Sequence, residues 1–184
     1  MTKVIVVNKK DQILDYQDKE KCHQKKGVLH RAFSIVVING HREILLQQRS
    51  KYKMLWPLFW SNTCCSHPNA KNAKKENAKN AKKNLITQAE QKLKEEMGFT
   101  ISLKPIFKFE YQAKYKDVGV ENELTTVLLG KYKEQKIKPD KNEVADYCWV
   151  SLDKLNKEIK KRPEIYTPWL KEIIKKLDGS KSFT

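Results

Sequence analysis

The chain has 184 residues, which is enough for one compact domain with a sizeable hydrophobic core and too short to expect two domains. Hydrophobic residues make up 39% and charged residues 33% of the chain, a composition that is polar but still globular. The formal net charge of +16 favours polyanions of any kind, whether nucleic acid, a membrane surface or a phosphorylated ligand, and so identifies no partner by itself.

No stretch approaches the roughly 20 apolar residues of a membrane-spanning helix. The N-terminal residues MTKVIVVNKK lack the apolar core and the small-residue cleavage site of a secretory signal. We therefore expect a cytoplasmic protein with no membrane span. The cysteines, Cys22, Cys64, Cys65 and Cys148, include no CxxC pair, so we expect free thiols and neither a disulfide framework nor a zinc knuckle.

The N-terminal half is rich in short apolar runs that have the length of strands. They lie at residues 4–7, 13–16, 32–38 and 44–48. A turn at residues 9–12 joins the first two, and Asn39-Gly40, a dipeptide typical of hairpins, joins the last two. An aromatic, proline-containing loop follows at residues 54–68 (MLWPLFWSNTCCSHP).

A low-complexity tract occupies residues 69–84 (NAKNAKKENAKNAKKN). It has no apolar face, which indicates either a floppy insertion or a solvated helix. Apolar residues then recur every four positions from Leu85 to Met97, and this spacing predicts a helix that ends at Gly98.

The C-terminal half is predicted to contain three strands, at residues 106–111, 124–129 and 146–150. Two helices follow, over residues 152–159 and 169–177, with Ser151 and Thr167 as their N-caps. Strands interleaved with a few helices indicate an α/β or α+β domain with a mixed sheet. We expect one domain over residues 1–184, with the 69–84 tract as an insertion.

Metal ligands are suggested by three histidines and two glutamates. They are His23, His30, His67, Glu121 and Glu123. The two glutamates alternate in what we predict to be the start of a strand, so their side chains leave the same face. Three imidazoles and two carboxylates suit a first-row divalent ion such as Zn2+, Mn2+ or Fe2+. The spacing alone does not show that the five residues converge, and each histidine taken singly is as readily a surface or core residue.

The run SNTCCSHP, preceded by WPLFW, resembles the signature loop of the type 1 isopentenyl-diphosphate isomerases. Shorter runs resemble further signatures of that family: HRAFS at 30–34, LKEEMG at 93–98, ENE at 121–123 and TPW at 167–169. Together the matches extend over nearly the whole chain. The resemblance implies a Nudix-type fold, in which a mixed β-sheet is sandwiched between helices. It also implies the interconversion of isopentenyl diphosphate and dimethylallyl diphosphate, two small allylic or homoallylic diphosphates.

Site residues are carried over from this resemblance position by position. Cys65, Glu123 and Tyr111 become the catalytic residues: Cys65 and Glu123 transfer protons, and Tyr111, near the reacting alkene, would relay the proton of Glu123. The three histidines and two glutamates become ligands of one divalent ion: Mn2+, Zn2+ or Mg2+. Glu96 would help to hold a second ion, Mg2+, on the substrate diphosphate. Lys19, Arg49, Lys53 and Lys92 match diphosphate-binding positions, although an arginine is usual where Lys92 stands. Trp169 matches an aromatic wall of the pocket.

These residue types suit a 1,3-allylic shift, which adds a proton at one end of an alkene and removes one from a neighbouring carbon. The positive charge that develops is stabilised by an aromatic ring face such as that of Trp169, by ~2 kcal/mol when desolvated. Cys65 needs a perturbed pKa to exchange a proton with carbon, which we expect a cationic, metal-rich pocket to provide.

Two other functions fit parts of the sequence. A hydrolase of the Nudix type presents an Arg-Glu pair and two further glutamates on one helix, whereas here Gln91 and Lys92 replace the pair and only Glu95 and Glu96 remain. A basic nucleic-acid-binding module would explain the lysine-rich tract, but no nucleic-acid-binding motif is present. We therefore expect no specific nucleic-acid partner.

We expect a monomer. We assign structural roles to the remaining cysteines and histidine, which are Cys22, Cys64, Cys148 and His41.

Overall fold

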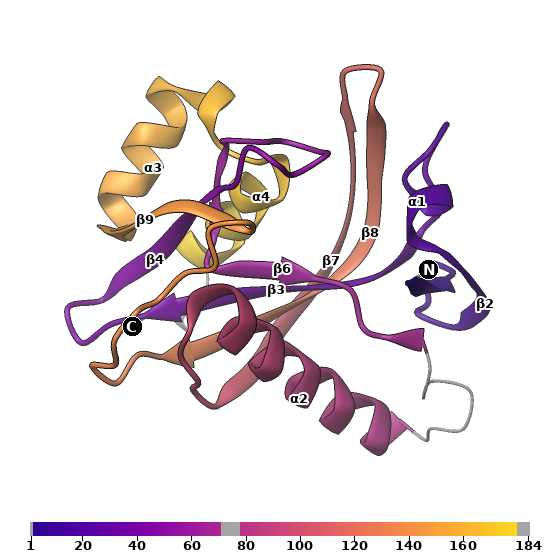
Figure 1. The fold of residues 1–184 in the computed structure, drawn as a ribbon, viewed down its shortest axis with the longest axis horizontal. Helices are drawn as coiled ribbons and strands as arrows, with labels where there is room; N and C mark the ends of the chain where they lie inside the picture. The colour runs from indigo at the N-terminus through magenta and orange to yellow at the C-terminus, as the bar shows by residue number, and fades with distance from the viewer. Residues whose placement is uncertain (1, 71–77, 180–184) are drawn as a thin grey trace.

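The computed structural model describes residues 2–70 and 78–179. Its strands are β1 (Lys3–Val7), β2 (Ile13–Asp18), β3 (His30–Ile38), β4 (Glu43–Arg49), β5 (Trp60–Asn62), β6 (Cys64–Ser66), β7 (Leu103–Tyr115), β8 (Gly119–Lys131) and β9 (Val144–Ser151). Its helices are α1 (Lys19–Cys22), α2 (Ala78–Met97), α3 (Leu152–Lys161), the 3-10 helix η2 (Pro163–Ile165) and α4 (Pro168–Asp178) (Figure 1).

Strand β3 is the central strand of one mixed sheet. It pairs in parallel with β8 from His30↔Glu123 to Ile38↔Lys131, and antiparallel with β6 through Ser34↔Cys65 and its neighbours. Strand β4 pairs with β5 and β9, and β7 pairs with β8 along its length. In Figure 1, β7 and β8 form a long two-stranded ribbon that projects beyond the other strands.

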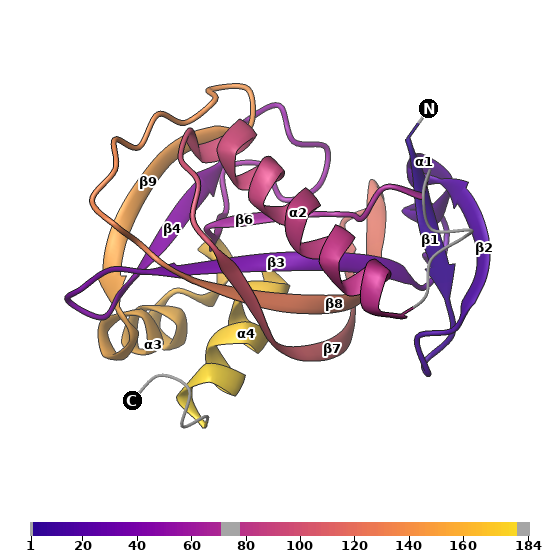
Figure 2. The ribbon, with the colours of Figure 1, turned by 90° about the horizontal axis from the view of Figure 1, so that it is seen from below.

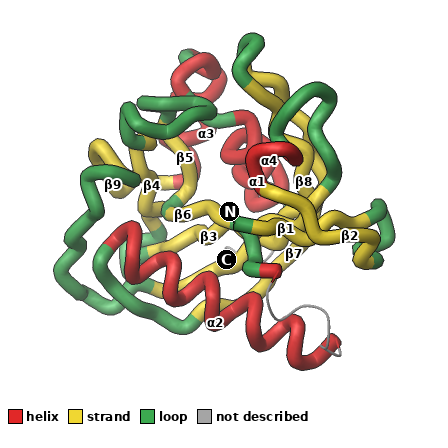
Figure 3. The backbone as a smooth tube through the Cα atoms, turned by 45° about the vertical axis from the view of Figure 1, so that its right-hand side comes forward, coloured by secondary structure: helices red, strands yellow, loops and turns green. Residues whose placement is uncertain are grey.

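Helices cover both faces of the sheet, with α2 on one side and α3 and α4 on the other (Figures 2 and 3). Alternate residues of β3 face the two sides, because strand side chains alternate. Ile35 and Val37 pack in the same buried cluster as Leu93 and Met97 of α2. Val36 belongs to a second cluster. This arrangement explains why the run over residues 32–38 is continuously apolar.

Helix α4 supplies much of the second cluster. Its buried residues are Trp169, Leu170, Ile173, Ile174 and Leu177, which recur at helical spacing. Burying side chains of this size stabilises the fold by about 1.5–3 kcal/mol each. The first turn of α4 is therefore held firmly against the sheet, and this anchors Trp169.

The predicted fold class, a mixed sheet between helices, is confirmed. The hairpin predicted from residues 4–7 and 13–16 is confirmed as β1 and β2, which pair antiparallel. The helices predicted over residues 152–159 and 169–177 are present as α3 and α4, and Ser151 caps α3 by accepting from the Lys154 amide. None of the described helices combines the length and the apolar character that crossing a membrane would require.

Several local predictions are wrong in the first half of the chain. The segment over 54–68 is not all loop, because residues 60–62 and 64–66 pair with β4 and β3 as strands β5 and β6. The hairpin predicted from residues 32–38 and 44–48 is shorter than expected, because these strands pair only at Ile38↔Ile44 while β4 pairs with β9 from Glu43 onward. In the connection between them, Arg42 and not Gly40 has the positive φ, of 62°.

Element ends also differ in the second half. Strands β7 and β8 are 13 residues long, because their polar, alternating portions pair with each other well beyond the apolar runs. Helix α2 begins at Ala78 and not at residue 85, so the end of the 69–84 tract is helical; residues 71–77 of the tract lie outside the described residues. Thr167 precedes α4 but makes no side-chain capping bond.

Gly98 ends helix α2 as predicted, with a φ of 79°. A Cβ atom at this position would lie 2.5 Å from the backbone oxygen of Lys138. The Gly98→Ala variant is therefore expected to lose about 1–3 kcal/mol of unfolding free energy from backbone strain, with the clash in addition. Gly40→Ala is the control, since nothing lies within 4 Å of its Cβ position. Equal denaturant midpoints for the two variants would contradict this account.

Candidate active site

The five predicted metal ligands converge. Each of His23, His30, His67, Glu121 and Glu123 offers one ligand atom, and these atoms all lie within 4.8 Å of one another. The residues come from the end of α1, the start of β3, the segment after β6, and β8. The parallel register places His30 directly opposite Glu123, so the sheet itself brings two of the five together. The convergence that spacing left open is thus present in the structure.

Backbone carbonyls orient two of the three imidazoles. His23 Nδ1 lies 2.6 Å from the Lys19 carbonyl oxygen, and His30 Nδ1 lies 2.7 Å from that of Val28. A carbonyl only accepts, so Nδ1 carries the hydrogen in both rings and Nε2 keeps a lone pair. This second contact of a ligating histidine fixes its tautomer and ring direction. Both Nε2 atoms are therefore prepared to bind a cation.

The cluster fits a divalent ion. His30 Nε2 and Glu121 Oε2 are buried and form no hydrogen bond among the described residues. His23 Nε2 lies 2.9 Å from Glu121 Oε2, and His67 Nε2 lies 2.9 Å from Glu123 Oε1. Unsatisfied buried polar atoms cost about 1–3 kcal/mol each, so native proteins rarely keep them without a ligand. Imidazole nitrogens and carboxylate oxygens together are a donor set for first-row divalent ions.

The charges in the cluster also favour a cation. Burial lowers the pKa of His67 to about 3, so its imidazole is neutral at physiological pH. Burial and the charge of Glu123 both raise the pKa of Glu121. Burial alone would raise the pKa of Glu123 too, but contacts with His67, His30 and Tyr111 hold it below its usual range. Two carboxylates that repel each other are stabilised by positive charge at their centre.

Most of the predicted site residues line one cavity of about 130 Å3 beside this cluster. They are Lys19, His23, Arg49, Lys53, Cys65, His67, Tyr111, Glu121, Glu123 and Trp169. Three predicted residues do not line it: His30 is fully buried, and Glu96 and Lys92 lie on helix α2. The cavity is smaller than the ~300–1,000 Å3 pockets that take drug-sized ligands, so it suits a small one.

A larger cavity, of about 610 Å3, lies elsewhere, between the N-terminal strands, helix α2 and strand β7. Its lining residues include Arg31, Leu85 and Phe107. The one carboxylate among its described lining residues, Asp11, is bound by Arg31 and Lys108 and so is not free for acid–base or metal chemistry. We therefore place the chemistry in the smaller cavity.

Cys65 presents a protonated thiol to the cavity. Burial raises its pKa to about 11, although the nearby charge of Arg49 opposes the shift. The sulfur lies 3.1 Å from Asn62 Oδ1 and 3.4 Å from Ser34 Oγ. The sequence suggested that a cationic pocket would perturb this pKa; in the structure burial outweighs the nearby positive charge, and the pKa shifts upward.

Glu123 is held by three neighbours. Tyr111 donates its hydroxyl hydrogen to Glu123 Oε2 over 2.7 Å, and Thr125 donates to the same oxygen over 3.1 Å. His67 lies against the other oxygen. Burial, followed by the charge of Glu123, raises the pKa of Tyr111 well above its usual value, so the phenol keeps its proton. The carboxylate thus has a fixed orientation at the wall of the cavity.

Arg49 and Trp169 form a second wall. The guanidinium carbon of Arg49 lies 5.3 Å from the centroid of the Trp169 ring. Arg49 also donates to the carbonyl oxygens of Trp56 and Leu55, over 3.0 and 2.7 Å. Two of its five N–H donors are therefore engaged by the backbone, and the others remain for a ligand. Trp169 is 3% exposed and packs edge to face against Trp56.

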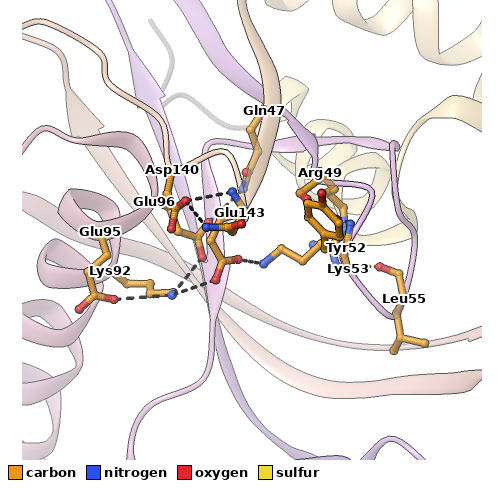
Figure 4. Close-up of polar contacts among 12 residues, drawn as sticks. Gln47, Arg49, Tyr52, Lys53, Leu55, Lys92, Glu95, Glu96, Asp140 and Glu143 are labelled. Atoms are coloured by element: carbon orange, nitrogen blue, oxygen red, sulfur yellow. Dashed lines mark hydrogen bonds and ion pairs between the residues drawn. The ribbon is translucent and has the colours of Figure 1, made fainter.

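Two of the predicted basic residues share one carboxylate, as Figure 4 shows. Lys53 pairs with one oxygen of Glu143, and Lys92 Nζ lies 3.7 Å from the other. Lys92 also lies 3.4 Å from Glu96 and 3.6 Å from Glu95. Although burial alone lowers the pKa of Lys92, the charges of Glu96 and Glu143 raise it, so this lysine stays cationic.

Sequence reasoning missed Ser34, Ser61, Asn62 and Glu143. Ser61 and Asn62 belong to the SNTCCSHP run, which drew attention to the segment without distinguishing their roles. Glu143 lies among lysines in a connection between β8 and β9, and no local pattern marks it. Only the folded arrangement brings it to Lys53 and Lys92.

Known proteins match this chain in sequence and in structure. The NUDIX domain family matches residues 28–172. The chain is 37% identical to isopentenyl-diphosphate Delta-isomerase 2 of Photorhabdus laumondii, over 93% of this chain and 89% of that relative. It is 34% identical to isopentenyl-diphosphate Delta-isomerase 1 of Bos taurus, over 92% and 79% of the two chains. A crystal structure from Deinococcus radiodurans superposes with a TM-score of 0.70 at 14% identity, over 95% and 98% of the chains, which supports the fold alone.

Metal addition tests the cluster. A divalent ion at 100 times its Kd would stabilise the folded protein by about 2.7 kcal/mol and raise the Tm by about 5–10 °C. We expect this rise with Mn2+ or Zn2+ in metal-free protein, and its near loss in the His30→Ala variant. His41→Ala, in a surface turn, is the control and should respond like the wild type. Equal rises in the wild type and His30→Ala would refute the assignment.

Proposed function

This chain belongs to the isopentenyl-diphosphate Delta-isomerase family of NUDIX domain proteins, and we propose that it interconverts isopentenyl diphosphate and dimethylallyl diphosphate. The observation that supports this most is the small cavity in which the Cys65 thiol and the Glu123 carboxylate both stand at the wall. An allylic shift needs two such proton-transferring groups around one short alkene.

The reaction forms one C–H bond and breaks another. A proton is added to the terminal alkene carbon, and one is lost from the methylene on the other side of the central carbon, so substrate and product have the same atoms. We assign these two transfers to Cys65 and Glu123. The reaction is reversible, and each group therefore donates in one direction and accepts in the other.

Tyr111 and Trp169 support the transfers. Tyr111 donates to Glu123 and retains its own proton, so it holds the carboxylate in place. The Trp169 ring offers its electron-rich face to the positive charge that develops on the central carbon, worth ~2 kcal/mol when desolvated. Trp169 and Leu55 are both almost fully buried and exclude water, which would otherwise capture the cation.

The five clustered residues would hold a divalent ion, which we propose to be Mn2+, Zn2+ or Mg2+. When bound, the ion supplies positive charge that offsets the two buried carboxylates and polarises Glu123. The chain's own contribution is to fix the imidazoles through the backbone carbonyls of Lys19 and Val28.

We propose that the diphosphate lies at the junction of two pockets. The small cavity contains Lys19, Arg49 and Lys53, and a neighbouring polar pocket of about 440 Å3 contains Lys92. Both pockets are lined by Ser66 and His67, so they adjoin there. Basic side chains bind phosphate oxygens through charge-assisted hydrogen bonds. Glu96, beside Lys92, would help to hold Mg2+ on the diphosphate.

Diphosphate hydrolysis is the rival activity, because it is common among proteins with this fold. Helix α2 argues against it. Lys92 stands where a hydrolase of this fold has a glutamate, and an ammonium group cannot ligate a metal, so helix α2 lacks one of the carboxylates that would hold the metals for water activation. A colorimetric assay for phosphate release from nucleoside diphosphate derivatives distinguishes the two activities.

The cytoplasmic location and the monomeric state stay predictions from the sequence.

Two substitutions test the proposed function. In metal-loaded protein with Mg2+ and isopentenyl diphosphate, we expect acid-labile allylic product from the wild type. Cys65→Ala and Glu123→Gln should each lower kcat by about 10²–10⁴-fold, the contribution of a positioned acid or base. Cys148→Ala is the control, since this thiol lies on β9 outside the cavity lining. Cys65→Ala activity within tenfold of the wild type would sink the assignment.

A further inference from the structure

A buried chain of hydrogen bonds joins the two sides of the cavity. Trp169 Nε1 donates to Ser61 Oγ over 2.9 Å. Ser61 Oγ lies 3.2 Å from Asn62 Oδ1, and the Cys65 sulfur lies 3.1 Å from the same oxygen. Ser61 and Asn62 are fully buried. The aromatic wall and the thiol are therefore connected through two residues to which we have assigned no role so far.

The direction of each bond follows from Asn62. Its Nδ2 lies 2.9 Å from the carbonyl oxygens of both Ile35 and Cys64. Carbonyl oxygens only accept, so both amide hydrogens are used there, and Oδ1 must be the atom that faces Ser61 and Cys65. The Ser61 hydroxyl and the Cys65 thiol consequently both donate to Asn62.

The Ser61 hydroxyl uses its hydrogen-bonding capacity in the same way. Its single hydrogen goes to Asn62, so its two lone pairs accept from Trp169 Nε1 and from Thr167 Oγ1, the latter over 3.4 Å. Thr167 thus binds Ser61 with the hydroxyl that would otherwise cap α4. Among the described residues, the Ser61 hydroxyl and the Asn62 side chain are thus fully engaged, and Ser61 Oγ also lies 4.0 Å from the Cys65 sulfur. A fully satisfied buried network has one arrangement and resists rotation of its members.

We propose that Ser61 and Asn62 are positioning residues of the isomerase reaction, which hold the Cys65 sulfur and the Trp169 ring in one mutual arrangement around the alkene. This inference rests on the proposed function. The cation formed on the alkene is short-lived, so the ring that stabilises it and the group that exchanges a proton must both be in place when it forms. Small displacements of reacting groups are costly to the chemical step.

The inference predicts a loss in kcat with little change in KM. The diphosphate is bound by basic residues, none of which belongs to this network, and they determine most of the affinity. Ser61→Ala removes the bridge and should lower kcat about tenfold or more, with KM within about threefold of the wild type.

Two further variants separate positioning from general stability. Thr63→Val removes another fully buried hydroxyl of the same segment, one that donates to the Leu45 carbonyl and does not line the cavity. It should lower the Tm and leave kcat within about twofold. Trp169→Phe removes the indole N–H at the far end of the chain. Ser61→Ala should lower kcat by a clearly smaller factor in the Trp169→Phe variant than in the wild type, because substitutions of linked residues are not additive.

The experiment is steady-state kinetics of these variants, with circular dichroism to confirm folding. An unchanged kcat in Ser61→Ala, an equal loss of kcat in Thr63→Val, or multiplicative losses of kcat in the double variant would each overturn the inference.

If Ser61→Ala does not fold, Asn62→Asp serves in its place. This variant keeps the side-chain size but puts an oxygen against the carbonyls of Ile35 and Cys64. We therefore expect kcat to fall again, with KM retained. An inactive wild type would refute the proposed function instead, so the two failures are distinguishable.

Discussion

The site depends on how strand β3 pairs with its neighbours. Parallel pairing with β8 sets His30 opposite Glu123, and antiparallel pairing with β6 sets Ser34 opposite Cys65. One strand thus fixes the carboxylate on one side and the thiol on the other. A slip of one residue in either pairing would turn these side chains to the opposite face of the sheet. Both faces of β3 are packed, against α2 on one side and α4 on the other, and this close packing opposes that slip.

Placing two carboxylates and three imidazoles in such a protected position has an energetic cost. Each buried charge loses several kcal/mol of solvation after relaxation, and Glu121 and Glu123 repel each other as well. Tyr111 and Thr125 offset part of that cost, because both donate hydrogen bonds to Glu123. A bound cation would offset the rest. A cation at this cluster would therefore stabilise the fold as well as the site.

Local sequence signals predicted most elements, whereas the residues of the cavity wall were predicted from the family resemblance. The apolar runs located β1, β3 and β4, and the four-residue spacing from Leu85 located the second half of α2, because these signals depend on near neighbours in the chain. The metal ligands were only suggested by composition, and the family resemblance supplied the reason to group them. Their convergence depends on strand register, which no local pattern contains.

What the sequence left out depends on distant contacts. Strands β5 and β6 are three residues long and exist because β4 and β3 offer them partners. Glu143 becomes relevant only when its connection folds against Lys53 and Lys92. The roles of Ser61 and Asn62 depend on which carbonyls the Asn62 amide meets. The left-handed residue of the Asn-Gly turn is Arg42, whose amide donates to the Asn39 carbonyl oxygen across the turn.

In the proposed reaction, two different protein groups carry the two protons of the allylic shift. The most direct test follows the hydrogen atoms: the metal-loaded wild type is given isopentenyl diphosphate in D2O, and the dimethylallyl diphosphate is examined by mass spectrometry and NMR at low conversion. The account predicts one deuterium in the newly formed methyl group, delivered by a protein group that exchanges with solvent. Product that retains all of its original hydrogens would mean that one group carries the same proton across the alkene, and the account would be wrong.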